Sequence, residues 1–336
     1  MRIDSFCHIL PKPYFDRLLL EQSPAAAYMQ KRVREIPCMY DMDERFRIMD
    51  RFAPYCQVLT LASPPIEALA GSDRTPDLAR LANDSMAELV ARYPDRFPAF
   101  VASLPMNAPD AALTELVRAV DQLGARGVQM FTNVSGKPLD RSEFAPLFAA
   151  MAQRDLPVWL HPARTATFPD YADEATSQFE LWWVFGWPYE TSVAMARLVF
   201  AGLFDLYPNL KIITHHGGGM VPHFSGRIGP GLDQLGKRTP AGEGMGSTHH
   251  TLQRRPFDYF KMFYADVALF GSVHATRCAL EFFGAEHMLF ASDMPFDPEG
   301  GPGYIRETIA VLDALQLDPT TRTAIDAGNA RRLLRL

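Results

Sequence analysis

Short apolar segments recur from one end of the chain to the other, and a stretch with helical character separates each segment from the next. Each segment is apolar without polar alternation and is bounded by Gly, Pro or Asp. This pattern is typical of strands buried on both faces of a parallel sheet. The eight segments are Ile3–Ile9, Gln57–Ala62, Phe97–Leu104, Gly127–Phe131, Pro157–His161, Lys211–His216, Phe263–Leu269 and Met288–Ser292.

The stretches between these segments carry helical periodicity. In Ala108–Leu123, apolar residues three and four positions apart form one stripe, as on the buried face of a helix. Similar helices are predicted at Glu143–Arg154, Thr191–Leu206, Ser272–Phe283 and Tyr304–Leu315, with a closing helix at Asp318–Asn329.

Eight strand–helix repeats in 336 residues predict an α/β protein of the (β/α)₈ TIM-barrel class, formed by a single domain over residues 1–336. A doubly wound open sheet uses similar elements and is the alternative. Two insertions, at about residues 11–51 and 162–189, exceed the minimal repeat. We expect them at the C-terminal face, where loops build the substrate pocket. The second is dense in aromatic residues, which fit a wall for a planar substrate or, equally, an oligomer interface or side core.

The composition excludes several classes of protein. The net charge of -6 and the isoelectric point near 5.9 argue against a nucleic-acid-binding protein, which usually has a basic face. The four cysteines are scattered without CxxC spacing, so we expect free thiols in a reducing compartment. The sequence shows neither a signal peptide nor an apolar run of the length that a membrane span needs. We therefore expect a cytoplasmic protein that binds neither nucleic acid nor a membrane.

Ionisable residues stand where several of the predicted strands end. His8 ends the first strand, His161 the fifth, and His215 and His216 the sixth, while Asp293 follows the eighth. In a barrel, the C-terminal strand ends converge on one mouth, so these distant positions become neighbours. Imidazoles and a carboxylate suit Zn²⁺ or another first-row divalent ion, with open positions for water or substrate.

The other histidines fall in predicted loops or helices, or at the wrong end of a strand: His223, His249, His250, His274 and His287. The pair His249 and His250 fits a surface metal site or, as we expect, a solvated loop. Residues Thr239–Ser247 are predicted to form a flexible surface loop without chemistry. His287 begins the last strand at its N-terminal end, which lies away from a barrel active site.

Several of these segments resemble the amidohydrolase superfamily, in particular its branch of aminocarboxymuconate-semialdehyde, resorcylate and carboxyvanillate decarboxylases. The matching segments are IDSFCHILP at the start, VWLHP at 158–162, LFDLYPNLKIITHHGGG at 203–219, MLFASDMPF at 288–296 and AIDAGNARRLL at 324–334. The resemblance implies that His8, His161 and Asp293 are metal ligands. It implies that His216, in the place of the histidine of the family's HxGG segment, is the acid/base group. His215 is expected to point elsewhere, because adjacent residues on a strand face opposite sides.

The sequence departs from the family pattern at residue 6. The family opens with His-x-His, or with Glu-x-His in some decarboxylases, and here Phe6 replaces the first ligand. Three protein ligands still make a workable catalytic site, although weaker metal binding, a different metal or metal-free chemistry are also compatible with this change. The Cys7 thiol is expected to face away from His8, so it is not a substitute ligand. Asp4 shares a strand face with Phe6 and His8, and is expected to support a ligand by hydrogen bonding.

The resemblance implies non-oxidative decarboxylation of an aromatic or unsaturated carboxylic acid, with a divalent metal as cofactor, Zn²⁺ foremost and Mn²⁺ as the alternative. Asp293 or a metal-bound water would protonate the ring carbon, and His216 would orient or supply that proton. A second hypothesis is hydrolysis of a lactone, ester or amide at the same site, with Asp293 as general base. A third is a non-catalytic barrel that has lost its metal, which the loss of a ligand at Phe6 suggests.

Further residues are predicted to bind the small-molecule substrate: Arg164, Phe185, Trp187 and Arg227. One of the arginines would pair with a second carboxylate, the alternative being that both are structural or exposed. The aromatic residues would hold the planar part of the substrate. A homodimer is also expected, since relatives of this kind often form one.

Overall fold

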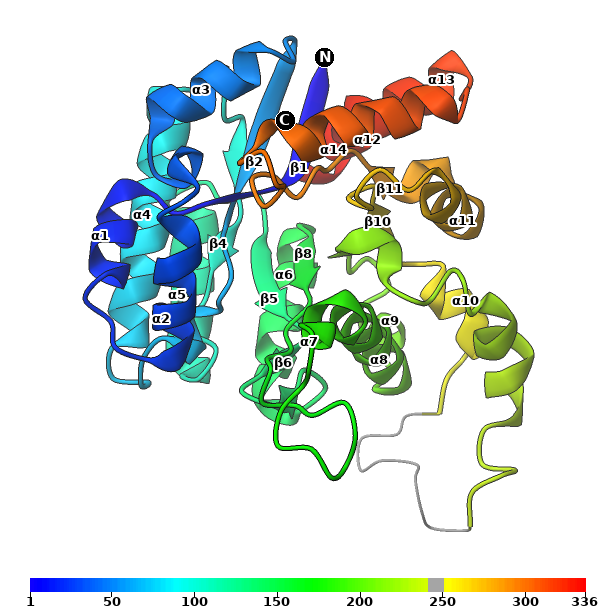
Figure 1. Cartoon of the computed structure of the whole chain (residues 1–336). Helices are drawn as coiled ribbons and strands as arrows, with labels where there is room; N and C mark the ends of the chain where they lie inside the picture. The colour runs from blue at the N-terminus through cyan, green and yellow to red at the C-terminus, as the bar shows by residue number, and fades with distance from the viewer. Residues whose placement is uncertain (241–250) are drawn as a thin grey trace.

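The computed structural model describes residues 1–240 and 251–336, apart from the side chains of residues 26–29 (Figure 1). The pair His249 and His250 and most of the predicted loop Thr239–Ser247 therefore lie outside the described residues. None of the helices in the described ranges combines the length and the apolar run that a membrane span requires.

The strands of the central wall follow the predicted segments. They are β1 (Arg2–Ile9), β2 (Tyr55–Leu61), β3 (Ala99–Phe100), β4 (Ala102–Ser103), β5 (Val128–Phe131), β8 (Val158–His161), β9 (Ile212–Thr214), β10 (Tyr264–Asp266) and β11 (Met288–Leu289). They pair in parallel, in the orders β1-β2-β3 and β4-β5-β8-β9-β10-β11. β3 and β4 are successive parts of one segment, because Ala99–Phe100 pair with β2 and Ala102–Ser103 pair with β5.

Backbone hydrogen bonds bring the last strand segment beside the first. Ser5 N donates to Phe290 O at 2.9 Å, and His8 N donates to Met294 O at 2.8 Å. In the opposite direction, Asp293 N donates to Phe6 O at 3.1 Å. The two ends of the strand order therefore meet, as a barrel requires, and the chain around Asp293 is fixed against β1.

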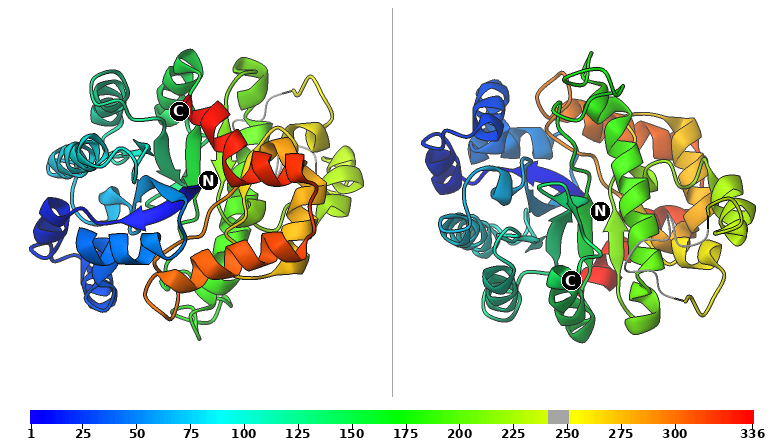
Figure 2. Two further views of the ribbon diagram at one scale, coloured as in Figure 1. Left: turned by 90° about the horizontal axis from the view of Figure 1, so that it is seen from above. Right: turned by 90° about the horizontal axis from the view of Figure 1, so that it is seen from below.

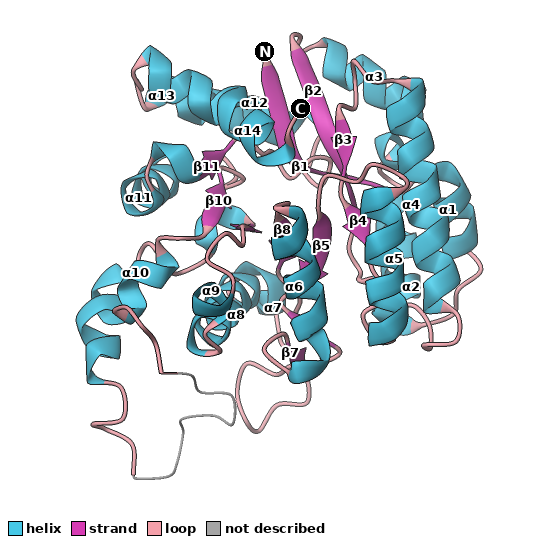
Figure 3. Ribbon diagram, turned by 180° about the vertical axis from the view of Figure 1, so that it is seen from behind, coloured by secondary structure: helices cyan, strands magenta, loops and turns pink. Residues whose placement is uncertain are grey.

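Helices alternate with these strands and surround them, which is clearest in the views from above and below (Figure 2); Figure 3 shows the helices and strands from behind. They are α1 (Lys12–Leu18), α2 (Pro24–Val33), α3 (Met42–Asp50), α4 (Thr75–Arg92), α5 (Pro109–Asp121), α6 (Ala145–Arg154), α7 (Leu181–Val184), α8 (Gly186–Phe200), α9 (Leu203–Leu206), α10 (Pro256–Phe260), α11 (Val273–Phe283), α12 (Pro302–Ala314), α13 (Pro319–Thr323) and α14 (Asn329–Leu334). A short antiparallel hairpin, β6 (Asn133–Val134) with β7 (Lys137–Pro138), follows β5.

The predicted helices are present with shifted ends. The predicted helix Thr191–Leu206 is divided into α8 and α9, because Gly202 adopts a φ of 71°, which a continuing right-handed helix does not allow. α11 begins where predicted, since the Ser272 side chain accepts a hydrogen bond from Ala275 N and caps the helix.

The apolar core has two layers. Inward-facing strand residues such as Phe6, Val58 and Trp159 pack inside the wall, together with Leu333 and Leu334 of α14. A larger cluster fills the space between the strands and the outer helices. α14 lies at the end of the wall where β1 begins, so it covers the N-terminal end of the strands (Figure 1). The active-site end is the other one, at which β8 and β9 end.

The two predicted insertions have different structures. Residues 11–51 hold α1, α2 and α3, and α1 packs against α4. Residues 162–189 are mostly irregular, with the short helix α7 and the start of α8, and they lie at the C-terminal end of the strands (Figure 1).

Candidate active site

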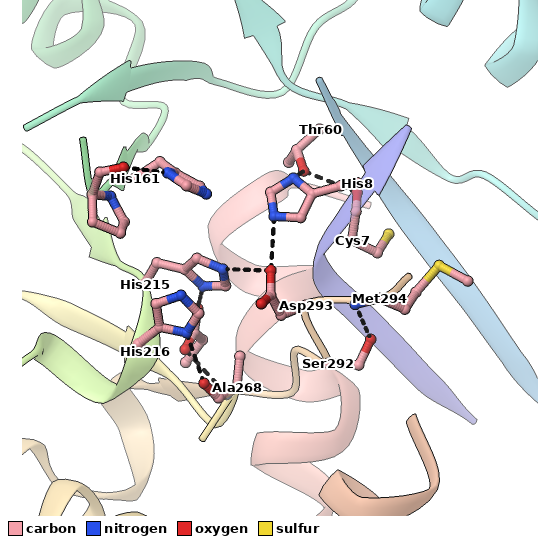
Figure 4. Close-up of polar contacts among 12 residues, drawn as sticks. Cys7, His8, Thr60, His161, His215, His216, Ala268, Ser292, Asp293 and Met294 are labelled. Carbon is pink, nitrogen blue, oxygen red and sulfur yellow. Dashed lines mark hydrogen bonds and ion pairs between the residues drawn. The ribbon is translucent and has the colours of Figure 1, made fainter. Parts of the chain in front are cut away.

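Four histidines and one aspartate from distant parts of the sequence meet at the C-terminal ends of the strands (Figure 4). His8 lies near the end of β1 and His161 ends β8, while His215 and His216 follow β9 and Asp293 follows β11. All five side chains are buried, with exposed fractions from 0% to 8%. The convergence predicted from the strand ends is therefore present in the fold.

The contacts among these residues define a compact cluster. Asp293 Oδ1 lies 2.9 Å from His8 Nε2 and 3.2 Å from His215 Nε2. The His161 ring centre is 5.3 Å from those of both His8 and His215. Among the described residues, possible ligand atoms gather within 4.8 Å of one another in two sets, His8–His161–His215 and His215–His216–Asp293. His215 belongs to both.

Backbone carbonyls fix the orientation of two of the rings. His161 Nδ1 lies 2.7 Å from Pro162 O, and His216 Nδ1 lies 2.9 Å from Ala268 O. A carbonyl oxygen can only accept a hydrogen bond, so Nδ1 carries the proton in both neutral rings and Nε2 keeps its lone pair. Each ring thus keeps a nitrogen available for a metal ion or a proton.

His8 is oriented in the same way by a hydroxyl group. The Thr60 hydroxyl donates to Cys7 O at 2.9 Å, so its oxygen is free to accept from His8 Nδ1, 3.3 Å away. His8 Nε2 then faces Asp293. The outer nitrogen of a metal-binding histidine is usually held by such a partner.

His215 does not point away from the site, so this prediction was wrong. It rested on the alternation of side chains along a strand, but β9 ends at Thr214, before both histidines. His216 then adopts a φ of 55°, and the two rings stack with their centres 3.7 Å apart. The Gly217–Gly219 turn that follows needs glycine, since a Cβ on Gly218 would lie 2.6 Å from the Phe283 ring.

Burial and neighbouring charges shift the pKa values of the cluster residues in different directions. Burial raises the pKa of Asp293, but the neighbouring His215 and His8 rings outweigh burial and hold this pKa well below its usual range. Burial lowers the pKa of His215, but Asp266 and Asp293 outweigh burial and raise it to about 9. Burial and the neighbouring His215 lower the pKa of His216 to about 4. At neutral pH, Asp293 is thus ionised and His216 is neutral.

Phe6 fills the place that the missing ligand would take. Its ring is fully buried and stacks on His215, with centres 3.8 Å apart and planes 16° apart. The Phe6 ring also lies 5.5 Å from the His8 ring and 5.8 Å from the His161 ring.

The Cys7 thiol faces away from His8, as predicted: it donates to Val58 O at 3.1 Å and packs in the outer core layer. A register shift between Asp4 and Cys7 in β1 marks a bulge at this point, a feature that often lies beside active sites.

Asp4 supports the cluster indirectly. Its carboxylate accepts hydrogen bonds from the Tyr55 hydroxyl, the Ser292 hydroxyl and Ser292 N. Burial raises the pKa of Asp4 to about 6, although these hydrogen bonds oppose the rise. Asp4 therefore fixes the residue that precedes Asp293, rather than a histidine.

The fold brings some of the predicted substrate-binding residues close to the cluster and leaves others away from it. Trp187 lies against the cluster, with its ring centre 5.5 Å from that of His161 and Nε1 donating to Arg164 O at 3.1 Å. The Arg164 guanidinium pairs with Glu190 at 3.0 Å. Phe185 is 66% exposed and Arg227 is exposed, so the structure does not bring these two into the cluster.

The outlying histidines have structural settings. His287 lies at the start of β11, where Nδ1 contacts Phe263 O and the ring stacks on Tyr264. His223 and His274 are exposed. These three histidines lie outside the two sets of possible ligand atoms at the strand ends.

Comparison with known proteins places the chain in a family. The sequence profile of the amidohydrolase family matches residues 3–336. The gamma-resorcylate decarboxylase of Polaromonas sp. strain JS666 is 34% identical over 306 residues, covering 88% of this chain and 87% of that protein.

The chain belongs to the amidohydrolase family.

Other relatives of this amidohydrolase extend the same picture. The 2-amino-3-carboxymuconate-6-semialdehyde decarboxylase of Dictyostelium discoideum is 28% identical and aligns over 100% of this chain and 92% of its own. The crystal structure of a dihydroxybenzoic acid decarboxylase from Polaromonas sp. JS666, with bound manganese and the inhibitor 2-nitroresorcinol, has a TM-score of 0.77 at 28% identity, with 100% and 97% of the chains covered. A 5-carboxyvanillate decarboxylase from Novosphingobium aromaticivorans, with a TM-score of 0.84 at 23% identity over 100% and 96% of the chains, has the same fold. The predicted family and barrel fold are confirmed.

Sequence reasoning missed three residues that hold the histidines of this amidohydrolase. Asp266, at the end of β10, hydrogen-bonds His215 Nδ1 and also accepts from Gly217 N and Ala268 N. Thr60 positions His8, and the fully buried Arg45 donates to His8 O at 2.9 Å. A carboxylate in the middle of the otherwise apolar segment Phe263–Leu269 was a detectable signal for Asp266. Arg45 lies in an insertion with no strand pattern to place it.

A small cavity of about 10 Å³ lies beside the cluster in this amidohydrolase, and Phe131, which packs on His161, forms part of its wall. Polar atoms of Glu67, Ser103 and Gln129 line it without a hydrogen-bond partner among the described residues. Burial raises the pKa of the Glu67 carboxyl to about 7. Glu67 is 7% exposed, so its ionised form is poorly solvated.

Relative to the native chain, Glu67→Gln is expected to be more stabilising at pH 8 than at pH 4. A carboxyl whose pKa is raised on folding contributes stability below its unfolded value near 4.5, and that stability is lost as the pH rises through about 7. The free energy of unfolding of the variant minus that of the native chain should grow by about 3 kcal/mol across this range, since each pKa unit is worth about 1.4 kcal/mol. Urea denaturation at the two pH values measures it. The exposed Glu88→Gln serves as the control, and an equal difference at both pH values for Glu67→Gln would contradict the assignment.

Proposed function

We propose that this amidohydrolase is a metal-dependent carboxy-lyase that removes a carboxyl group, without oxidation, from an aromatic or unsaturated carboxylic acid. The observation that carries the proposal is the cluster at the strand ends, where buried imidazoles and one ionised carboxylate converge. Similarity across nearly the whole chain to decarboxylases that act on resorcylate and on aminocarboxymuconate semialdehyde supports a lyase over a hydrolase.

The donor set fits a first-row divalent ion. His8, His161 and Asp293 are the proposed ligands, and His161 and His8 each direct Nε2 away from the group that holds Nδ1. Imidazole and carboxylate suit both Zn²⁺ and Mn²⁺. Zn²⁺ was the ion expected from the sequence, and the manganese in a solved relative makes Mn²⁺ equally worth testing. When bound, such an ion would supply the positive charge that holds the substrate carboxylate and an adjacent oxygen.

The chain's own residues handle the proton. Decarboxylation breaks the bond between the ring carbon and the carboxylate, releases CO₂ and adds a proton to that carbon. Because Asp293 is ionised and His216 is neutral in the free enzyme, the one proton that the reaction consumes must first be taken up by one of these two groups, from the substrate or from water. In this proposal Asp293 delivers it to the ring carbon, and His216, with Nδ1 fixed on Ala268 O, holds or passes it at Nε2.

The aromatic segment 162–189 forms part of the proposed substrate pocket. Trp187 is its best-placed residue, since its ring lies edge-on to His161. Arg164 lies in the same segment but is paired with Glu190. Roles for Arg164, Phe185 and Arg227 in binding the substrate stay predictions, as do the homodimer and the cytoplasmic location.

A panel of hydroxylated benzoic acids, incubated with the purified chain in D₂O with Mn²⁺ or Zn²⁺, tests the proposed reaction. We expect one CO₂ released per substrate consumed, and one deuterium in the product at the carbon that lost the carboxylate. Hydrolysis of aryl lactones or esters with no CO₂ from any acid would instead support the hydrolase hypothesis and contradict the proposal.

A further inference from the structure

The cluster contains one imidazole that the family pattern does not include, that of His215, beside a position where a ligand is missing. Phe6 stands where the family has its first His or Glu ligand. The ring stacked directly on Phe6 is that of His215, with centres 3.8 Å apart and planes 16° apart. An imidazole from the end of β9 thus lies beside the side chain of β1 that cannot bind a metal.

His215 is central in the arrangement of ligand atoms. Among the described residues, it is the residue shared by the set that contains His8 and His161 and the set that contains Asp293. Its Nε2 atom lies 3.2 Å from the same Asp293 oxygen that His8 contacts at 2.9 Å (Figure 4). His215 Nε2 is therefore a possible metal-ligand atom close to those of both His161 and Asp293, whereas the Phe6 side chain has no atom that can bind a metal.

The surroundings of His215 hold it in a ligand orientation. The Asp266 carboxylate takes a hydrogen bond from Nδ1, and Asp266 is itself fixed by Gly217 N at 3.3 Å and Ala268 N at 3.2 Å. A carboxylate on the outer nitrogen directs the other nitrogen and its lone pair toward a metal. The ring is fully buried between Phe6 and His216, so packing also restricts its rotation.

We propose that His215 replaces residue 6 as a protein ligand, so that His8, His161, His215 and Asp293 together bind the divalent ion. The proposal rests on the metal-dependent function proposed above. It assigns Phe6 a packing role against the His215 ring and leaves His216, with its own Nε2, as the group that handles the proton. The site then keeps the number of protein ligands that the family pattern has, with one ligand supplied by a different strand.

The test measures metal affinity rather than activity. Purified chain is stripped with a chelator and titrated with Mn²⁺ or Zn²⁺ against a competing chromogenic chelator. We expect His215→Ala to lower the affinity at least 10- to 100-fold, since loss of a partner that merely orients a ligand already has effects of that size. The exposed His274→Ala is the matched control, with unchanged affinity. Affinity in His215→Ala equal to that of the native chain would overturn the proposal.

A second pair of variants guards against a folding defect. Phe6→His in the His215→Ala background restores a donor on β1, and we expect it to recover at least about 10-fold of the lost affinity. Asp266→Asn, which keeps the shape of the side chain, is expected to weaken binding about 10-fold with a native circular dichroism spectrum. Normal binding in Asp266→Asn together with no recovery from Phe6→His would count against His215 as a ligand. If His161→Ala abolishes binding while His215→Ala does not, the metal site stands and only this inference fails.

Discussion

Asp293→Asn lowers kcat/KM for CO₂ release by at least about 10³-fold. The carboxylate is 6% exposed and contacts Nε2 of both His8 and His215. Asparagine keeps the shape but removes the negative charge and the ability to accept and deliver a proton. Loss of general acid–base catalysis alone costs about 10² to 10⁴-fold, and weaker metal binding adds to it.

The measurement is steady-state CO₂ release at saturating metal, with the exposed Asp95→Asn as a control that should retain full activity. Saturating metal separates the loss of the proton step from the loss of the ion. An Asn variant within 10-fold of the native rate would show that Asp293 is not the proton carrier.

The second large effect is on metal content. His161→Ala is expected to reduce bound metal from one ion per chain to a small fraction after gel filtration, with affinity at least about 100-fold lower. Asp293 contacts His8 and His215, whereas the contact given for His161 Nδ1 is with Pro162 O at 2.7 Å, so Nε2 is the nitrogen of His161 that is left to bind the ion.

Elemental analysis of the purified variant measures this effect. His287→Ala is a useful control, because His287 is also part-buried and bonded to a backbone carbonyl, but lies at the opposite end of the strands. Both proteins should show native far-ultraviolet spectra. Unchanged metal stoichiometry in His161→Ala would defeat the ligand assignment.

The strand pattern predicted which residues meet, because parallel strands place all their C-terminal ends at one mouth. His8, His161 and Asp293 are separated by more than a hundred residues, yet each follows or ends an apolar segment. The segments were predictable since strands buried on both faces have few polar residues. The repeat alone left a doubly wound open sheet as the alternative, and the hydrogen bonds between the first and last strand segments decide for the barrel.

The orientation of His215 was not predictable in the same way. Side-chain alternation holds only within a strand, and the sequence does not show that β9 ends two residues before His216. His216 has a positive φ and is followed by a glycine turn that packs closely against Phe283, a residue distant in the sequence. Local sequence patterns therefore predict that a residue lies at the C-terminal mouth of the barrel, but they do not predict the direction of its side chain.

Supporting residues were harder to predict than ligands. Thr60 and Asp266 act through hydrogen bonds that cross between neighbouring strands, so their partners are far away in the sequence. Arg45 reaches His8 O from α3, within an insertion whose packing no periodic pattern describes. Such contacts depend on tertiary structure rather than on the type of residue.

Titration of Mn²⁺ into the metal-free native chain, with bound ion measured by electron paramagnetic resonance and CO₂ release measured on the same samples, is the most direct test of a metal-dependent decarboxylase site. We expect CO₂ release to be absent without metal, to rise in step with bound ion and to level off at one ion per chain. Full CO₂ release from chain without bound metal would contradict this prediction, as would binding of one ion per chain without any effect on the rate.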